Sequence, residues 1–283
     1  MLSYFQAFIL GGLQGITELF PVSSLGHSVI LPKLLGWDIS QHDDAFLVFL
    51  VTTHFATAIV LFFFFFSDWK KIVAGIFRSL RMRRIDTEDT YARLGWMLII
   101  ATIPAGILGL LFEEKFKLLF ATPLFAALFL FANGFMLLGA EALRKKKKET
   151  TRDDAHVAKL SWKKTVFIGF AQTIALLPGF SRTGATLGGG LLVGLGHEDA
   201  ARFSFLMATP IIGAAAMLKL PELLASGKSA ELGPTLFGAF ISGIAAYFSV
   251  RFLSKYFKSN DLSLFGYYCL LFGGLASLRF LFF

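Results

Sequence analysis

The stretch QGITELFPVSSLGH at residues 14–27 decides the fold that we expect for this chain. It places an amide, an acid, two adjacent serines and an imidazole inside an apolar N-terminal region. A second polar stretch, PGFSRTGAT at residues 178–186, lies in equally apolar surroundings in the second half of the chain. We interpret the remainder as a membrane scaffold that brings the two stretches together.

The composition indicates a polytopic membrane protein. Of the 283 residues, 55% are hydrophobic and 34 are Phe, and the mean hydropathy is +0.67. Soluble domains rarely carry several apolar runs of about 20 residues. The net charge of +8 lies mainly in short loops, so topology and anionic membrane lipid explain it better than a nucleic-acid partner does. The single cysteine, Cys269, excludes an intramolecular disulfide and a cysteine metal cage.

Two pairs of apolar runs are too short to cross a bilayer. Residues 3–19 and 24–36 flank the first polar stretch, and residues 165–177 and 184–195 flank the second. We expect each pair to form a re-entrant hairpin, because irregular backbone at that depth needs protein or a water-filled cavity around it. The alternative is one continuous span or an interfacial hairpin. Because Glu18 already interrupts the first run and no basic segment precedes it, we do not expect a cleaved signal peptide.

The fold class that we predict is an all-α polytopic membrane protein with six full spans and four half-helices. The six spans are predicted at residues 45–66, 92–111, 122–143, 201–220, 234–252 and 264–282. Residues 1–283 form a single integral membrane domain, with one repeat at 1–143, a basic cytoplasmic linker at 144–164 and a second repeat at 165–283. Each repeat is one hairpin plus three transmembrane helices, and this odd number inverts the topology of the second repeat.

The charge pattern orients the two hairpins. Residues 67–91 and 144–164 are strongly basic, so we expect both segments to be cytoplasmic, the first as a charged loop. The loops at 37–44, 112–121 and 221–233 then lie outside. The first hairpin enters from the outside and the second from the inside, so their tips can meet within the membrane.

Glu18 and Arg182 mark a candidate site. Each lies within an apolar region, where such a charge costs about 2.5–3.5 kcal/mol to insert, so a functional role is the first hypothesis. The alternative is a structural pair that locks the hairpins together. Gln14 and Glu18 share a helix face and could hold a hard cation, Mg²⁺ or Ca²⁺, or Glu18 could act as a general base.

Ser24 and His27 are spaced as a nucleophile and its base, or as an attacking imidazole oriented by a serine. The spacing leaves both options open. The second stretch has the composition of a phosphate or diphosphate cradle, in which glycines admit the ligand, hydroxyls bind it and the Arg182 guanidinium pairs with it. The candidate substrate-binding residues are Ser23, Ser181, Thr183, Thr186, Gly179 and Gly184. His54, within a predicted span, is a weaker candidate, because a satisfied core histidine explains it equally well.

The two stretches resemble the signatures of the undecaprenyl-diphosphate phosphatases, also called bacitracin-resistance proteins, and the resemblance covers nearly the whole chain. It implies hydrolysis of undecaprenyl diphosphate to undecaprenyl phosphate and inorganic phosphate, which recycles the lipid carrier for peptidoglycan synthesis. It also implies a multi-pass protein of the bacterial plasma (inner) membrane, an active site facing the outside, bacitracin resistance and a divalent cation, Mg²⁺ or Ca²⁺.

By position, the resemblance assigns catalytic roles to Glu18, Ser24, His27 and Arg182, and metal contacts to Glu18 and Gln14. Many family members have Glu where this chain has Gln14, and this difference places the acid–base role on Glu18. The rival function is a membrane transporter or flippase of an anionic or polyprenyl-phosphate lipid, because inverted repeats are typical of transporters. The small-residue face at 238–243 could pack within one monomer or between the protomers of a homodimer.

Overall fold

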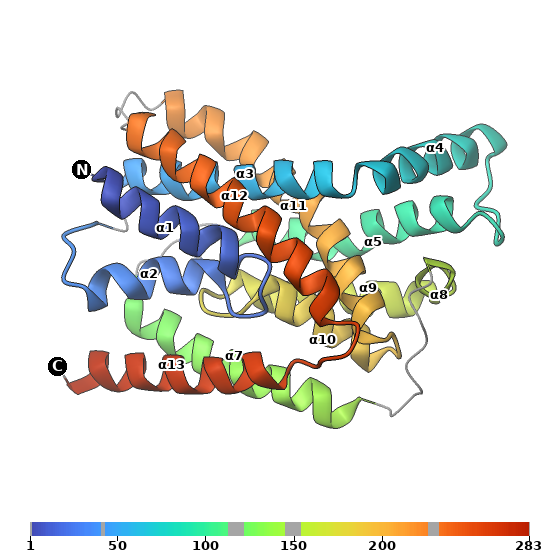
Figure 1. The fold of residues 1–283 in the computed structure, drawn as a ribbon. Helices are drawn as coiled ribbons and strands as arrows, with labels where there is room; N and C mark the ends of the chain where they lie inside the picture. Colours follow the sequence, from blue (N-terminus) through green and yellow to red (C-terminus); the bar gives the residue numbers. More distant parts are fainter. Residues whose placement is uncertain (1, 41–42, 113–121, 145–153, 226–231, 283) are drawn as a thin grey trace.

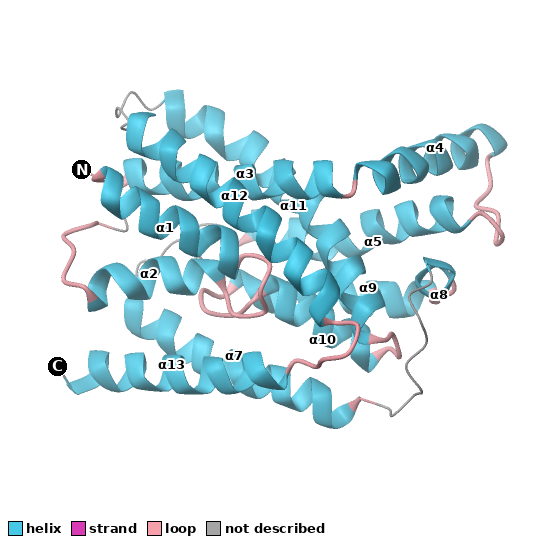
Figure 2. Ribbon diagram, viewed as in Figure 1, coloured by secondary structure: helices cyan, strands magenta, loops and turns pink. Residues whose placement is uncertain are grey.

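The computed structural model describes residues 2–40, 43–112, 122–144, 154–225 and 232–282, and the regular structure within these ranges is helical (Figure 2). Six helices in the described ranges are long and apolar enough to cross a membrane. They are α3 (Asp44–Phe64), α5 (Thr90–Leu111), α7 (Pro123–Leu143), α11 (His197–Ala225), α12 (Leu232–Tyr256) and α13 (Ser263–Phe282). The prediction of six full spans is confirmed, and the chain is a multi-pass membrane protein.

Four shorter helices flank the two polar stretches. They are α1 (Tyr4–Thr17), α2 (Ser24–Leu34), α9 (Trp162–Thr173, continued by the 3₁₀ turn η1 at Ile174–Leu176) and α10 (Arg182–Leu192). Serines of the two stretches begin the second helix of each pair, because Ser23 Oγ accepts from the Gly26 amide and Ser181 Oγ accepts from the Gly184 amide. Such caps satisfy amides that the helix itself leaves free, so each stretch turns the chain and starts a helix at the same point.

The prediction of a charged loop at residues 67–91 is wrong over most of its length. Helix α4 (Phe66–Met82) continues the direction of α3 after a break at Phe65 and lies along α5 (Figure 1). Ile72, Gly75 and Ser79 are buried on one side of α4, while charged residues such as Lys70 and Arg78 share the rest of its surface with exposed apolar side chains such as Phe77. The charges made the segment resemble a loop, whereas its apolar residues recur with helical spacing.

Smaller differences concern the ends of elements. The predicted linker contains a short helix, α8 (Asp154–Ala158), and its residues 145–153 lie outside the described ranges. Most of the predicted external loop at 112–121 also lies outside them. Helix α11 begins at His197, before the predicted residue 201, with Glu198 and Asp199 in its first turn. Acidic side chains there are stabilised by the positive end of the helix dipole.

The two halves of the chain pack against each other reciprocally. Helix α1 packs on α12 and α9 packs on α5, while α3 lies against α11 and α7 against α13 (Figure 1). The contact of α1 with α12 depends on glycine, because a Cβ at Gly11 would collide with the carbonyl of Gly238. The small-residue face of α12 is therefore used within the monomer, and the homodimer stays a prediction.

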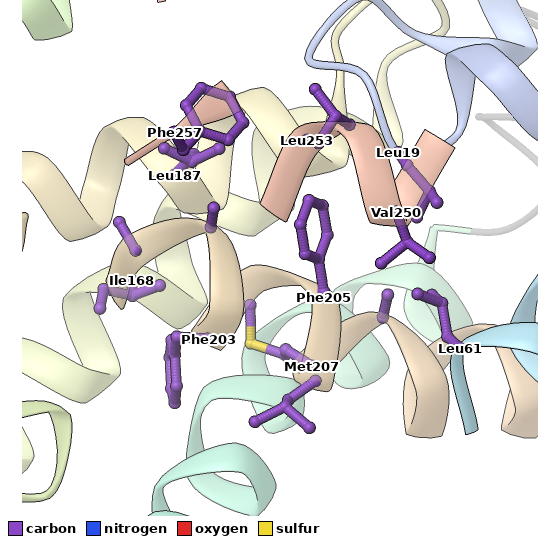
Figure 3. Close-up of a cluster of buried hydrophobic side chains, with 14 of the residues drawn as sticks. Leu19, Leu61, Ile168, Leu187, Phe203, Phe205, Met207, Val250, Leu253 and Phe257 are labelled. Carbon is purple, nitrogen blue, oxygen red and sulfur yellow. The ribbon is translucent and has the colours of Figure 1, made fainter. Parts of the chain in front are cut away.

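The main hydrophobic core joins both halves. It contains Leu19 after α1, Leu61 of α3, Ile168 of α9, Phe205 of α11 and Val250 of α12 (Figure 3). Side chains from α11 lie between those of the other helices in this view. The core thus fixes the short helices, and with them the two polar stretches, against the long spans.

Candidate active site

Asn133 joins the two polar stretches to one another. Its Nδ2 donates to the Pro21 carbonyl at 2.9 Å, and its Oδ1 accepts from the Ser181 amide at 3.0 Å. Asn133 is fully buried in α7. The tips therefore meet inside the molecule, while their entry from opposite sides of the membrane stays a prediction. Asn133 was not among the predicted site residues, although a lone Asn inside an apolar span is a polar group in an apolar segment, as Glu18 is.

Glycines let the tips touch. A Cβ at Gly26 would lie 3.0 Å from Gly179 Cα, and a Cβ at Gly184 would lie 3.3 Å from the Pro21 carbonyl oxygen. Gly179 has φ +106, a conformation that side-chain-bearing residues rarely adopt, and α7 covers it closely. We predicted that Gly179 and Gly184 bring backbone to a ligand. In the structure a Cβ at Gly179 would meet α7 and a Cβ at Gly184 would meet Leu137, Ser181 and Pro21, so both glycines serve close packing, and their approach to a ligand stays a prediction.

Glu18 and Arg182 form an ion pair across the tips. Arg182 Nη2 lies 3.0 Å from Glu18 Oε1, and Nη1 reaches towards the Ser204 carbonyl at 3.5 Å. Both side chains are largely shielded from solvent. The Thr183 hydroxyl donates to the Glu18 carbonyl at 3.0 Å, which ties the start of α10 to the end of α1. The structure thus brings together the two residues that the sequence singled out because a charge is costly to insert into an apolar region.

The second carboxylate oxygen of Glu18 collects three further groups. Ser24 Oγ donates to Oε2 at 2.6 Å, and Gln14 Nε2 donates to it at 3.2 Å. His54 Nε2 lies 3.3 Å from the same oxygen. Glu18 is therefore the centre of a buried cluster that α1, α2, α3 and α10 assemble.

The contacts of His54 suit a ring that carries a proton on each nitrogen. Its Nδ1 lies 2.7 Å from the Leu50 carbonyl, which can only accept, so Nδ1 is protonated. Its Nε2 faces a carboxylate oxygen, which also accepts. A proton on Nε2 satisfies both groups and makes His54 cationic. Together with Arg182, His54 gives the cluster more positive than negative charge, which suits an anionic ligand.

His27 lies apart from this cluster. Its Nδ1 is 2.7 Å from the Ser23 carbonyl, its Nε2 is 2.7 Å from the Tyr268 hydroxyl, and its ring stacks on Tyr268 and Phe272. The predicted pairing of His27 with Ser24 is therefore not seen. Ser24, at the first position of α2, turns back to Glu18, whereas His27 lies one turn further along and faces α13.

A cavity of about 380 Å³ opens from the cluster. Its polar end is formed by Glu18, Ser23, Ser24, His54, Gln172, Ser181 and Arg182. Apolar side chains of α3, α5 and α11, such as Leu50, Ala105 and Ile212, line most of the rest, with Lys219 also on the wall. A cavity with one polar end and long apolar walls matches an amphiphilic ligand.

The predicted hydroxyls divide into two groups. Ser23 and Ser181 line the cavity, although Ser181 Oγ also accepts from the Gly184 amide of its own tip and donates to the Phe20 carbonyl of the first tip. Thr186 Oγ1 bonds Ser204 Oγ at 2.6 Å and the Arg182 carbonyl at 2.9 Å, so it braces α10 against α11. Neither Thr183 nor Thr186 lines the cavity, and the hydroxyls of both residues bond protein groups. This arrangement differs from the predicted contact with substrate.

Gln172 of α9 belongs to the site, although the sequence alone did not single it out. It lines the cavity and is 2% exposed, yet neither its Nε2 nor its Oε1 has a partner among the residues that the structure describes. A buried amide without hydrogen bonds costs about 1–3 kcal/mol. An oxygen-rich ligand in the cavity would remove that cost.

The donor set fits a cation only in part. Within the described ranges, no group of three or more His, Cys, Asp or Glu side chains gathers as a metal site requires. Glu18 already accepts from four donors, so as arranged it is not a free metal ligand. Gln14 Oε1 is buried and lacks a partner in the described structure, and an amide oxygen suits Mg²⁺ or Ca²⁺. As arranged, the described residues do not form a metal site, because Gln14 is fully buried and does not line the cavity.

The fold and the cluster define a multi-pass membrane protein with a buried polar centre at the end of a largely apolar cavity. Residues 7–275 match the family model of the bacitracin resistance protein BacA, so the chain belongs to that family.

Curated relatives are similar in sequence to this chain over nearly their whole length. Undecaprenyl-diphosphatase 2 of Frankia alni is 42% identical over 99% of this chain and 98% of the relative. Undecaprenyl-diphosphatase of Mycolicibacterium paratuberculosis is 44% identical over 96% of each. Undecaprenyl-diphosphatase 2 of Chromobacterium violaceum is 43% identical over 95% of each.

Proposed function

We propose that this chain hydrolyses undecaprenyl diphosphate to undecaprenyl phosphate and inorganic phosphate at the cluster around Glu18. The function recycles a lipid carrier of peptidoglycan synthesis, and it underlies the bacitracin resistance after which the family is named. The names of the relatives support the reaction. The single observation that carries the mechanism is the 2.6 Å hydrogen bond from Ser24 Oγ to Glu18 Oε2 at the wall of the cavity.

The substrate lies with its diphosphate at the polar end and its isoprenoid chain along the apolar walls. Arg182 and His54 supply positive charge, and the Gln172 amide donates to a phosphate oxygen. Phosphoryl transfer depends mainly on such positioning and charge neutralisation. Ser23 and Ser181, which also line the cavity, offer further hydroxyls to the substrate.

Ser24 is the nucleophile in the first step. Its proton passes to Glu18 Oε2 as the Oγ–P bond forms to the terminal phosphorus. The bond from that phosphorus to the bridging oxygen breaks, and its electron pair leaves with undecaprenyl phosphate. Ser24 is favoured over His27 because Ser24 touches both a base and the cavity, whereas both His27 nitrogens are engaged elsewhere.

Water completes the cycle in the second step. Its oxygen attacks the phosphorus of phosphoserine, and the Oγ–P bond breaks. Ser24 Oγ takes back the proton that Glu18 holds, so the carboxylate is restored. Both protons of the water leave on the released phosphate. Glu18 thus acts as base and then acid at one oxygen, which is the acid–base role that the sequence assigned to it.

A divalent cation, Mg²⁺ or Ca²⁺, belongs to the proposal as a companion of the diphosphate. Gln14 Oε1 does not line the cavity as arranged, so it would contact the cation only after a rearrangement, and Glu18 would do so only after losing one of its present donors. When bound, the cation would neutralise charge on the diphosphate.

The proposed location is the bacterial plasma membrane, with the cavity open to the outside. Phe46 and Leu47 at the start of α3 and Lys219 near the end of α11 line the cavity. These residues adjoin the loops at 37–44 and 221–233, which the charge pattern places outside. The reciprocal packing of α1 on α12 and α9 on α5 supports the two inverted repeats that this topology requires.

The test uses the purified full chain in detergent with undecaprenyl or farnesyl diphosphate. We expect phosphate release with Mg²⁺ or Ca²⁺ added, and none from Ser24→Ala. A single-turnover quench should trap an acid-stable phosphate adduct on Ser24, while an acid-labile adduct on His27 would contradict the mechanism. Absence of phosphate release from the wild-type chain would overturn the enzymatic function and favour lipid transport.

A further inference from the structure

His27 is buried at the end of the first polar stretch, residues 14–27, yet the mechanism proposed above gives it no chemical role. Its ring is 2% exposed and lies between the Ser23 carbonyl and the Tyr268 hydroxyl, at 2.7 Å from each. Tyr268 belongs to α13, so this contact joins the first hairpin to the last helix of the chain.

The Ser23 backbone needs such support. Its φ of 66° and ψ of 100° lie in a region that residues with a Cβ rarely occupy. Such a conformation persists only when neighbouring groups hold it. The Ser23 carbonyl accepts from both the backbone amide and the ring of His27, and Ser23 Oγ accepts from the Gly26 amide. Of the two bonds to the carbonyl, that from the ring is the shorter, at 2.7 Å against 3.3 Å.

The positions of the protons in this chain of hydrogen bonds follow from the group that can only accept. The Ser23 carbonyl can only accept, so His27 Nδ1 carries the proton. In the neutral ring Nε2 then has a lone pair and accepts from the Tyr268 hydroxyl. The Ser23 carbonyl therefore sets the tautomer, and Tyr268 supports it by donating to Nε2, while its stacking on His27 fixes the plane of the ring.

Ser24 follows Ser23 directly, so the direction of its side chain depends on that turn. We propose that Tyr268 is a positioning residue, which acts through His27 to hold the Ser23 turn and so keeps Ser24 Oγ on Glu18. This inference rests on the proposed function, because it assumes that Ser24 is the nucleophile. It gives His27 a role in the reaction without contact with phosphorus.

Tyr268→Phe tests the inference with little structural change, because the ring that stacks on His27 and Phe272 remains. We expect kcat to fall about 10- to 100-fold, since small displacements of a reacting group have effects of that order. KM should stay unchanged, and the rate of phosphoserine formation in a single turnover should fall by the same factor as kcat. The matched control is Tyr267→Phe, because Tyr267 is the neighbouring residue and is 63% exposed; it should behave as wild type.

Variants of His27 separate positioning from chemistry. Asn can present an amide N–H near the position of Nδ1, so His27→Asn should keep at least tenfold more activity than His27→Ala. A nucleophilic His27 would make both variants equally inactive. Wild-type kcat in Tyr268→Phe, or a change in KM alone, would overturn the inference. Absence of activity or of a serine adduct in the wild-type chain would instead overturn the proposed function.

Discussion

Arg182 Nη2 lies 3.0 Å from Glu18 Oε1, although 164 residues separate the two in the sequence. The contact joins the end of α1 to the first residue of α10, so each polar stretch completes the other. Around it, Ser24 and His54 approach the opposite carboxylate oxygen. One carboxylate thus contacts the proposed nucleophile Ser24 and the Arg182 and His54 side chains, and removal of any one of these groups should affect the others.

Glu18→Gln should abolish most turnover. The amide cannot take the Ser24 proton, and general base catalysis contributes about 10²–10⁴-fold. The change also leaves the Arg182 and His54 cations without a counter-charge, so we expect thermal unfolding at a lower temperature. The measurements are kcat from phosphate release and the unfolding temperature in detergent. Diphosphate bound in the cavity should raise the unfolding temperature more for Glu18→Gln than for the wild-type chain, because the anion replaces the negative charge of the lost carboxylate. Retention of more than about a tenth of wild-type kcat would contradict the role of Glu18 as base.

Asn133→Ala should lower stability as well as activity. It leaves the Pro21 carbonyl and the Ser181 amide without their partner, and each buried unsatisfied group costs about 1–3 kcal/mol. Asn133→Asp should be no better, because a carboxylate can accept from Ser181 but cannot donate to Pro21. The unfolding temperature measures the effect. Asn260→Ala is the control, since Asn260 is exposed, and an equal shift in the two variants would argue against the bridge.

Gly26→Ala should disturb the site through the contact of the tips. The new Cβ would lie 3.0 Å from Gly179 Cα, a backbone atom that cannot move away as a flexible side chain would. We expect kcat to fall at least tenfold, because Ser24 lies two residues before Gly26 and would shift with it. Gly139→Ala in α7 is the control, because its Cβ would meet nothing within 4 Å. That variant should keep full activity and gain up to about 1 kcal/mol from helix propensity.

The sequence predicted the elements whose signal is local. The free-energy cost of placing a charge in an apolar region identified Glu18 and Arg182. Apolar runs of about 20 residues identified the six spans. It could not predict which partner a side chain would choose. Three-residue spacing placed Ser24 and His27 on one face of their own helix, but the neighbours of that helix decide that Ser24 meets Glu18 and His27 meets Tyr268.

Other features carried a signal that was not used. Asn133 is polar within an apolar span, as Glu18 is, and it should have been a candidate on the same ground. The amphipathic spacing of Ile72, Gly75 and Ser79 predicts a helix at α4, although the charges of that segment suggested a loop. His54 was left undecided because a histidine inside a helix has no preferred side until its tertiary neighbours are known.

Gln172→Leu should weaken substrate binding and leave the chemical step nearly intact. The unpartnered amide lines the cavity, and we expect it to bind an oxygen of the phosphate group whose phosphorus is not attacked. Loss of one hydrogen bond to a charged group costs about 1.5–3 kcal/mol, so KM should rise about 10- to 100-fold while kcat changes less than threefold. Removal of an unsatisfied amide should also raise the unfolding temperature of the free protein, an effect opposite to that of an ordinary core substitution. Thr173→Val, at a neighbouring residue whose hydroxyl bonds only the Phe170 carbonyl among described contacts, is the control. A fall in kcat at constant KM would instead place Gln172 beside the attacked phosphorus.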